Sequence, residues 1–182
     1  SRGLGDVYKR QVAEGPWTGS TLPELIGRFG AELLGKANYA RFGQEFPLLV
    51  KFIDAREDLS IQVHPDDELA RKRHGKSGKC EMWYVLEAEP GASLLTGFSR
   101  PIAPAEYERR VADNTLTDVL NRQAIASGDV FYLPAGRVHS IGKGSFIVEI
   151  QQSSDITYRI YDFDRRDAAG NSRELHTELA RE

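Results

Sequence analysis

Short apolar or alternating stretches, separated by glycine and proline turns, fill the chain from residue 47 onward. Runs of this length, about 4–8 residues, are typical of β-strands. The predicted strands are residues 47–54, 59–64, 81–87, 93–98, 130–134, 145–152 and 157–161. Helical patterns at 66–73 and 104–112, and a turn at 115–120, fall between groups of strands. The sequence therefore predicts a mainly β fold with helical insertions, either an antiparallel barrel or a sandwich.

Ahead of these strands the pattern is helical. Thr21 and Glu24 form a capping-box signature, with an acidic residue three positions after a helix-capping hydroxyl. Apolar residues then recur at helical spacing from Leu22 to Leu34, and Gly35 suits a helix end. We expect one amphipathic helix here, followed by a short turn at 38–43.

Both ends of the chain differ from ordinary domain ends. Residues 1–11 start with serine and show neither a clear period nor a capping signal. We expect them to be a non-native leader, with residues 12–182 forming one domain. Residues 173–180 show a helical pattern that no glycine, asparagine or proline closes. We expect that the chain was cut there.

Composition narrows the class of protein. The 182 residues include 24 Lys and Arg against 27 Asp and Glu, a net charge of −3. That balance excludes a basic nucleic-acid-binding domain and a polybasic membrane surface. The single cysteine excludes an intrachain disulfide and a cysteine-rich zinc module. The apolar runs are far shorter than the ~18 residues of a membrane span, and no signal peptide is visible. We expect a soluble, cytoplasmic protein.

Two strands carry candidate ligands. Side chains alternate along a strand, so Ser60, Gln62 and His64 share one face, opposite Ile61 and Val63. Taken alone, such a strand is more often a hydrogen-bonded edge strand than a ligand site.

The second signal is the stretch from Gly128 to His139, with the spacing G-x5-P-x-G-x2-H. Pro134 fixes φ and Gly136 permits a tight corner, which aims His139 inward. This spacing resembles the second motif of the cupin superfamily.

Glu81 opens the strand that follows Lys79 and completes a candidate metal site. Together Gln62, His64, Glu81 and His139 supply two imidazoles, a carboxylate and an amide oxygen. This set suits Zn²⁺ and tolerates other divalent metals. A position would stay open to water or substrate, as in catalytic sites. Open positions also fit non-haem iron, so spacing alone does not name the metal.

Longer segments resemble one family. LSIQVHPDD at 59–67, KCEMWY at 79–84 and SSDITYRIYD at 153–162 occur in the order found in type I mannose-6-phosphate isomerases, closest to the shorter bacterial form. The similarity runs from about Gly19 to the end. It implies a cupin-type antiparallel β-barrel, or jelly roll, incomplete here because the family's N-terminal segment and C-terminal cupin domain are missing. Residues 12–182 would then be the metal-binding cupin domain.

The resemblance also implies an enzyme, an intramolecular oxidoreductase that interconverts mannose 6-phosphate and fructose 6-phosphate through a cis-enediol with one zinc ion per chain. The family's metal ligands fall on Gln62, His64, Glu81 and His139. Its substrate-site serine falls on Ser60, and a site lysine, both catalytic and substrate-binding, on Lys79. An active-site arginine falls on Arg159, an acid/base candidate on Glu149 and another pocket acid on Asp155. The implied partner is a small sugar phosphate, and the oligomeric state stays open.

Two other readings compete with an isomerase: a cupin that binds sugar without catalysis, and an iron-dependent cupin oxygenase. Oxygenase-type cupins usually carry a His-x-His pair with a glutamate a few residues on. Here the first position is Gln62, and Glu81 lies well beyond His64. A binding module would not need Arg159 or Glu149. We therefore favour the isomerase. Of the remaining histidines, His74 and His176 lie in charged stretches and are expected to be solvated.

Overall fold

A computed structural model of the chain describes residues 11–167 and 169–181. All but the last residue of the expected leader, 1–11, lies outside the described part. The chain divides into two compact units, with the boundary between residues 47 and 48, and each unit is described by itself. Within the described residues, no helix has the length and apolarity needed to cross a membrane.

The first unit holds three short helices: α2 (Leu22–Phe29), α3 (Ala31–Leu34) and α4 (Lys36–Phe42). The predicted capping box is present, because Thr21 and Glu24 each accept a backbone N–H hydrogen bond from the other. The single helix expected over 22–34 is wrong: it breaks at Gly30, whose φ of +48° leaves the helical region. The turn expected at 38–43 belongs to α4.

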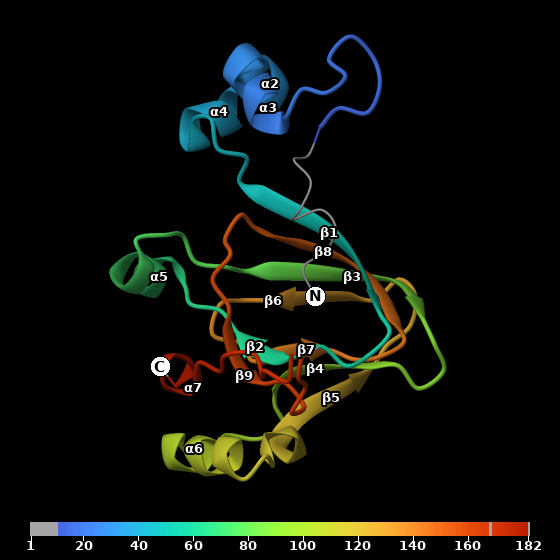
Figure 1. Cartoon of the computed structure of the whole chain (residues 1–182), viewed down its shortest axis with the longest axis vertical. Coiled ribbons are helices and arrows are strands. Elements are labelled where there is room, and N and C mark those ends of the chain that lie inside the picture. The colour runs from blue at the N-terminus through green and yellow to red at the C-terminus, as the bar shows by residue number, and fades with distance from the viewer. Residues whose placement is uncertain (1–10, 168, 182) are drawn as a thin grey trace. The chain divides into compact units, whose positions relative to one another are not determined.

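The second unit consists of two antiparallel sheets that face one another (Figure 1). One sheet has the order β1 (Leu48–Ala55), β8 (Ser145–Gln152), β3 (Glu81–Ala88), β6 (Val130–Leu133). The other has the order β5 (Leu120–Ala124), β4 (Ser93–Phe98), β7 (His139–Ile141), β2 (Ile61–Val63), β9 (Tyr158–Tyr161). The mainly β, antiparallel prediction is confirmed. Within the described residues, hydrogen bonds do not join the two sheets into one closed barrel.

Two apolar layers stabilise this unit. The inner layer lies between the sheets around Trp83, which is fully buried with Leu94 and Ile147. The outer layer covers the far side of the five-stranded sheet. It packs beneath α6 (Pro104–Ala112) and the 3₁₀ turn η1 (Leu116–Val119), together with α5 (Asp67–His74) and α7 (Thr177–Ala180). Figure 1 shows α6 on that outer side.

The outer face of the four-stranded sheet is also apolar. Its large exposed side chains are Leu48, Val50, Phe52, Tyr84, Val130 and Tyr132. The apolar character of this face arises partly from β1, whose sequence has apolar residues at inward and outward positions alike.

Two further expectations differ from the structure. Strand β5 was not predicted, because its sequence LNRQA is polar and lacks β-branched residues; pairing with β4 creates it. The helix expected over 173–180 is wrong for its first half, since only Thr177–Ala180 is helical. The residue just before this helix hydrogen bonds to β9 instead: the backbone N–H of His176 donates to the Arg159 carbonyl oxygen.

Candidate metal centre

Strand β2 presents two of the predicted ligands to the space between the sheets. Ile61 and Val63 lie in the outer apolar layer, so Gln62 and His64 lie on the opposite, inward face. The central position of β2, between β7 and β9, holds them from both sides. Ser60, two residues before Gln62, is buried at the start of the strand.

The third predicted ligand, His139, enters from β7, directly beside β2. Gly136 at the preceding corner has φ of +80°, a conformation that favours glycine. Its N–H donates to the carbonyl oxygen of His64 at 2.9 Å, which fixes the corner against the first ligand segment. Gln62 and His139 are direct partners in the β2–β7 ladder, so their side chains lie on the same face.

Glu81 comes from the other sheet, as the first residue of β3, and reaches across to both histidines. Its Oε1 lies 3.2 Å from His64 Nε2, and its Oε2 lies 3.5 Å from His139 Nε2. One ligand atom from each of the three residues lies within 4.8 Å of the others. All three residues are buried. The structure thus brings these predicted ligands into a single cluster.

Gln62 lies at the edge of the cluster. Its amide nitrogen is 3.4 Å from His139 Nε2. The amide oxygen and nitrogen exchange places by rotation about the terminal bond, so the amide offers either an acceptor or a donor to this space. As an acceptor, Gln62 adds a fourth ligand to the set.

Backbone carbonyls set the tautomer of both histidines. His64 Nδ1 lies 3.0 Å from the Ile156 carbonyl oxygen, and His139 Nδ1 lies 2.8 Å from that of Arg137. A carbonyl oxygen only accepts hydrogen bonds, so each Nδ1 carries the proton. Each Nε2 therefore directs a lone pair toward Glu81, the arrangement that metal-bound histidines use.

Burial and nearby charges keep His64 and His139 neutral and Glu81 ionised, the protonation states that bind a metal. Burial lowers the pKa of His64 to about 4, although its short contact with Glu81 opposes the effect. Burial likewise lowers the pKa of His139. For Glu81, burial alone would raise the pKa, but the contact with His64 and the positive charge available at His139 and Lys79 lower it well below its usual range. Near neutral pH the set is two neutral imidazoles and one carboxylate, as metal binding requires.

The cluster also leaves buried acceptors without donors. His64 Nε2 and Glu81 Oε2 have no hydrogen-bond partner among the described residues. Glu81 Oε1 forms a buried ion pair with Lys79 Nζ at 2.8 Å, which balances the carboxylate charge but gives no donor to these two atoms. Converging acceptors without protons between them are unfavourable in a protein interior. A bound cation resolves this, so the donor set fits a divalent metal.

Glu149 lies on β8, one strand away from the cluster. Its Oε1 is 3.0 Å from Lys51 Nζ, and Trp83 Nε1 donates to its Oε2 at 3.2 Å. The Trp83 ring in turn meets the His139 ring edge-on at 5.3 Å between centroids. Glu149 is therefore connected to a ligand through Trp83. Lys51, which also donates to Gln151, was missed from the sequence; a lysine inside the apolar run of β1 was the available signal.

Arg159 lies beside the cluster, whereas Asp155 lies on the surface. Arg159 is the direct partner of Gln62 in the β2–β9 ladder and shares its face. Its guanidinium donates to the Glu174 carbonyl, and its Nε is buried with no hydrogen-bond partner among the described residues. Asp155, in the loop between β8 and β9, is exposed and pairs with Lys76 at 2.9 Å. The structure does not bring Asp155 into contact with the ligands.

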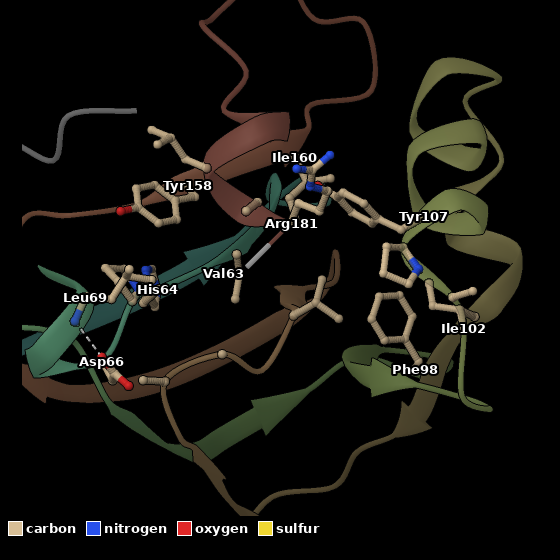
Figure 2. Close-up of a pocket in the computed structure, with 18 residues that line it drawn as sticks. Val63, His64, Asp66, Leu69, Phe98, Ile102, Tyr107, Tyr158, Ile160 and Arg181 are labelled. Carbon is tan, nitrogen blue, oxygen red and sulfur yellow. Dashed lines mark hydrogen bonds between the residues drawn. The ribbon is translucent and has the colours of Figure 1, made fainter. Parts of the chain in front are cut away.

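A separate cavity of about 280 Å³ lies on the other side of the five-stranded sheet, between β2, β9, α6 and α7 (Figure 2). Its walls combine the apolar Val63, Phe98 and Ile160 with the polar His64, Asp66 and Arg181. Among the residues that line it, His64 also belongs to the metal cluster.

Comparison with known proteins agrees with this site. Residues 11–99 match the family described as phosphomannose isomerase type I, catalytic domain. The chain is 42% identical to the mannose-6-phosphate isomerase of Streptococcus mutans, covering 92% of this chain and 51% of that protein. It is also 42% identical to mannose-6-phosphate isomerase ManA of Bacillus subtilis, covering 91% and 51%.

The fold agrees as well. The crystal structure of the mannose 6-phosphate isomerase from Bacillus subtilis superimposes with a TM-score of 0.84 at 38% identity, over 94% of this chain and 53% of that one. The chain therefore spans about half the length of the relatives it matches. In its sequence over nearly the whole chain, in its fold and in its buried His–Glu–His cluster, this chain is similar to the type I phosphomannose isomerases.

Proposed function

We propose that the chain interconverts mannose 6-phosphate and fructose 6-phosphate. The observation that carries the proposal is the buried cluster of His64, Glu81 and His139, whose ligand atoms all lie within 4.8 Å of one another. The relatives named as mannose-6-phosphate isomerases support the choice of substrate. The charged sugar phosphates do not cross membranes unaided, so we place the reaction in the cytoplasm.

We propose that Gln62, His64, Glu81 and His139 hold a zinc ion. Two imidazoles with carboxylate and amide oxygens form a borderline-to-hard set that zinc accepts readily. When bound, such a cation polarises and orients substrate oxygens. An oxygenase is disfavoured because its usual His-x-His pair is replaced by Gln62 and His64.

Side chains near the cluster are assigned to proton transfer, charge stabilisation and substrate binding. The reaction moves a proton between C1 and C2, which requires a base near those carbons and a positive charge for the developing enediolate. We assign the base to Glu149, which has to exchange its contact with Lys51 for the substrate. Arg159 stabilises negative charge, because a guanidinium stays protonated throughout. Ser60 and Lys79 are assigned to substrate binding, with Lys79 also able to shift protons near Glu81. Asp155 is not given a role, because it is exposed and pairs with Lys76.

The proposal is tested by metal content and turnover of the purified 182-residue chain. Elemental analysis is expected to find one zinc per chain, and a coupled assay is expected to detect mannose 6-phosphate isomerisation that a chelator abolishes and Zn²⁺ restores. His139→Ala is expected to lose the metal, whereas His74→Ala, outside the cluster, keeps it. Full zinc occupancy in His139→Ala would remove this residue from the ligand set. Turnover that survives complete chelation would overturn the metal-dependent mechanism.

A further inference from the structure

Residues 173–177, here called the clamp segment, run beside β9 and hold Arg159 by its backbone. The N–H of Arg159 donates to His176 Nδ1 at 3.2 Å, and the backbone N–H of His176 donates to the Arg159 carbonyl at 2.7 Å. His176 therefore satisfies both backbone groups of one residue, through its ring and its main chain. The ring is largely buried, with 23% of the side chain exposed, instead of solvated as its sequence context predicted.

The clamp segment also contacts the side chain of Arg159. A terminal nitrogen of the guanidinium donates to the Glu174 carbonyl oxygen at 3.2 Å. One side of the guanidinium is thereby occupied, while its buried Nε has no partner among the described residues. The contact restricts a long side chain that otherwise has many rotamers.

Both ends of the clamp segment are anchored. At one end, the buried carboxylate of Asp162 accepts from Arg173 Nε at 2.6 Å and from Arg165 at 2.7 Å. At the other end, the Thr177 carbonyl accepts from the Tyr107 hydroxyl of α6 at 3.2 Å. The segment is thus held against the five-stranded sheet from two directions, and it can transmit that rigidity to Arg159.

We propose that His176 is a positioning residue for Arg159, which sets the guanidinium beside the Gln62 side of the metal cluster. The inference rests on the proposed isomerase function, in which Arg159 stabilises the charge that develops on the substrate. The ring Nδ1 of His176 acts on Arg159, because its hydrogen bond goes to that backbone N–H; the His176 carbonyl separately accepts from the Ala180 N–H in α7. Its Nδ1 must accept, so the neutral tautomer with the proton on Nε2 is the working form.

The test first compares three variants of the zinc-loaded chain with the parent chain. His176→Ala removes the acceptor and is expected to lower kcat/KM about 10-fold, the low end of the loss seen when an orienting partner is removed, with zinc content unchanged. His176→Asn places an amide oxygen near the position of Nδ1 and is expected to recover activity to within about threefold. Leu175→Ala, an exposed neighbour in the same segment, is the matched control and stays at the level of the parent chain.

The decisive measurement is a double-mutant cycle. In the Arg159→Ala background, His176→Ala is expected to cause no further loss, because the group it positions is gone. An equal loss in both backgrounds, or an Asn variant as impaired as the Ala variant, would overturn the positioning role. Circular dichroism of each variant identifies any that fails to fold. If His176→Ala does not fold, the kcat/KM of His176→Asn decides whether His176 positions Arg159.

A second readout separates this inference from the proposed function. The Arg159 Nε–H signal in NMR is expected to be protected from solvent exchange in the parent chain and in His176→Asn, and to exchange fast in His176→Ala. If the parent chain shows no isomerisation, the proposed function fails while this signal still tests the clamp. Equal protection in all variants would overturn the clamp whatever the activity.

Discussion

At the scale of single residues, the candidate site depends on where protons lie. His64 and His139 each place a proton on Nδ1, against a carbonyl oxygen, so both Nε2 lone pairs face Glu81. Burial disfavours a second proton on either ring. Lys79 balances the Glu81 carboxylate, and a bound cation would pair with the two Nε2 lone pairs. The same residues in an exposed site would not need one.

Arg159 is expected to act on turnover and not on metal binding. Arg159→Ala removes the guanidinium of the residue opposite Gln62 in the β2–β9 ladder, so kcat should fall at least about 100-fold, the scale expected for loss of an oxyanion-stabilising donor. Zinc content, measured by elemental analysis, should stay at the parent value. Arg166→Ala, whose exposed side chain contacts only a loop carbonyl, is the control. Unchanged turnover in Arg159→Ala would refute its role.

Trp83 is expected to orient Glu149 through one N–H. Trp83→Phe keeps most of the apolar packing but removes the Nε1 donor to Glu149 Oε2. We expect a loss of kcat of about tenfold, typical of a missing orienting partner, and a loss in stability of about 1–3 kcal/mol from the cavity. Steady-state kinetics and urea unfolding measure the two effects separately. Parent kinetics in Trp83→Phe would show that this hydrogen bond does not serve catalysis.

At the scale of elements, the site depends on close backbone approaches near the ligand strands. Gly78 precedes Lys79, and its N–H donates to the Asp67 side chain at the start of α5 at 2.8 Å. A Cβ at Gly78 would lie 2.3 Å from the Asp66 carbonyl carbon, a distance that real side chains do not adopt. The backbone of α5 is therefore packed directly against the segment that leads into Glu81.

Gly78→Ala is expected to destabilise the chain by about 1–3 kcal/mol, the usual cost of overpacking, and to weaken zinc binding by shifting Lys79 and Glu81. The matched control is Gly27→Ala in α2, where a Cβ meets nothing within 4 Å and where alanine should stabilise the helix by about 0.5–1 kcal/mol. Urea unfolding gives both values. Equal stability of the two variants would contradict the close approach at Gly78.

The sequence predicted elements well wherever local chemistry determines them. β4, α6 and β8 have the expected bounds, and the capping box at Thr21 forms as predicted. β5 escaped prediction because its pairing with β4, and not its polar sequence, makes it a strand. The clamp segment escaped for a similar reason: its helical spacing loses to hydrogen bonds with Arg159. Long-range pairing of this kind leaves no local pattern to read.

The candidate site shows the same division. The alternation along β2 and the corner at Gly136 indicated that Gln62, His64 and His139 are inward-facing, and the family resemblance placed metal ligands on the same residues. Contacts between sheets were not predictable from spacing. For this reason the exposure of Asp155, the pairing of Glu149 with Lys51 and the burial of His176 emerge only in three dimensions.

At the scale of the whole molecule, ion pairs around the buried carboxylate of Asp162 hold the segment that follows β9. Burial alone would raise the pKa of Asp162, but hydrogen bonds and positive charge from Arg173 and Arg165 lower it on balance. The folded chain thus holds this carboxylate in its charged form more strongly than the unfolded chain does. The resulting stability is present above the ordinary pKa of aspartate and is lost as the pH falls through the lowered value.

Asp162→Asn is expected to lower the stability at pH 7 by about 2 kcal/mol, somewhat less than the loss of a fully buried pair, because its arginines are partly exposed. The difference between the parent and Asp162→Asn should shrink as the pH falls below about 4, where the parent also loses the charge. Urea unfolding at several pH values measures it. A difference that is constant with pH would mean that Asp162 acts through packing alone.

The ligands enter the cluster from both sheets and from positions far apart along the chain. Gln62 and His139, which lie next to each other in space, are 77 residues apart in sequence. During synthesis, a nascent chain therefore has no complete cation site until His139 has left the ribosome and β7 has paired with β2. Loop closure over such a separation is slow and precedes any gain from the ligands. A cation held by all three residues would therefore bind after β2, β3 and β7 have come together, and it would link one sheet to the other.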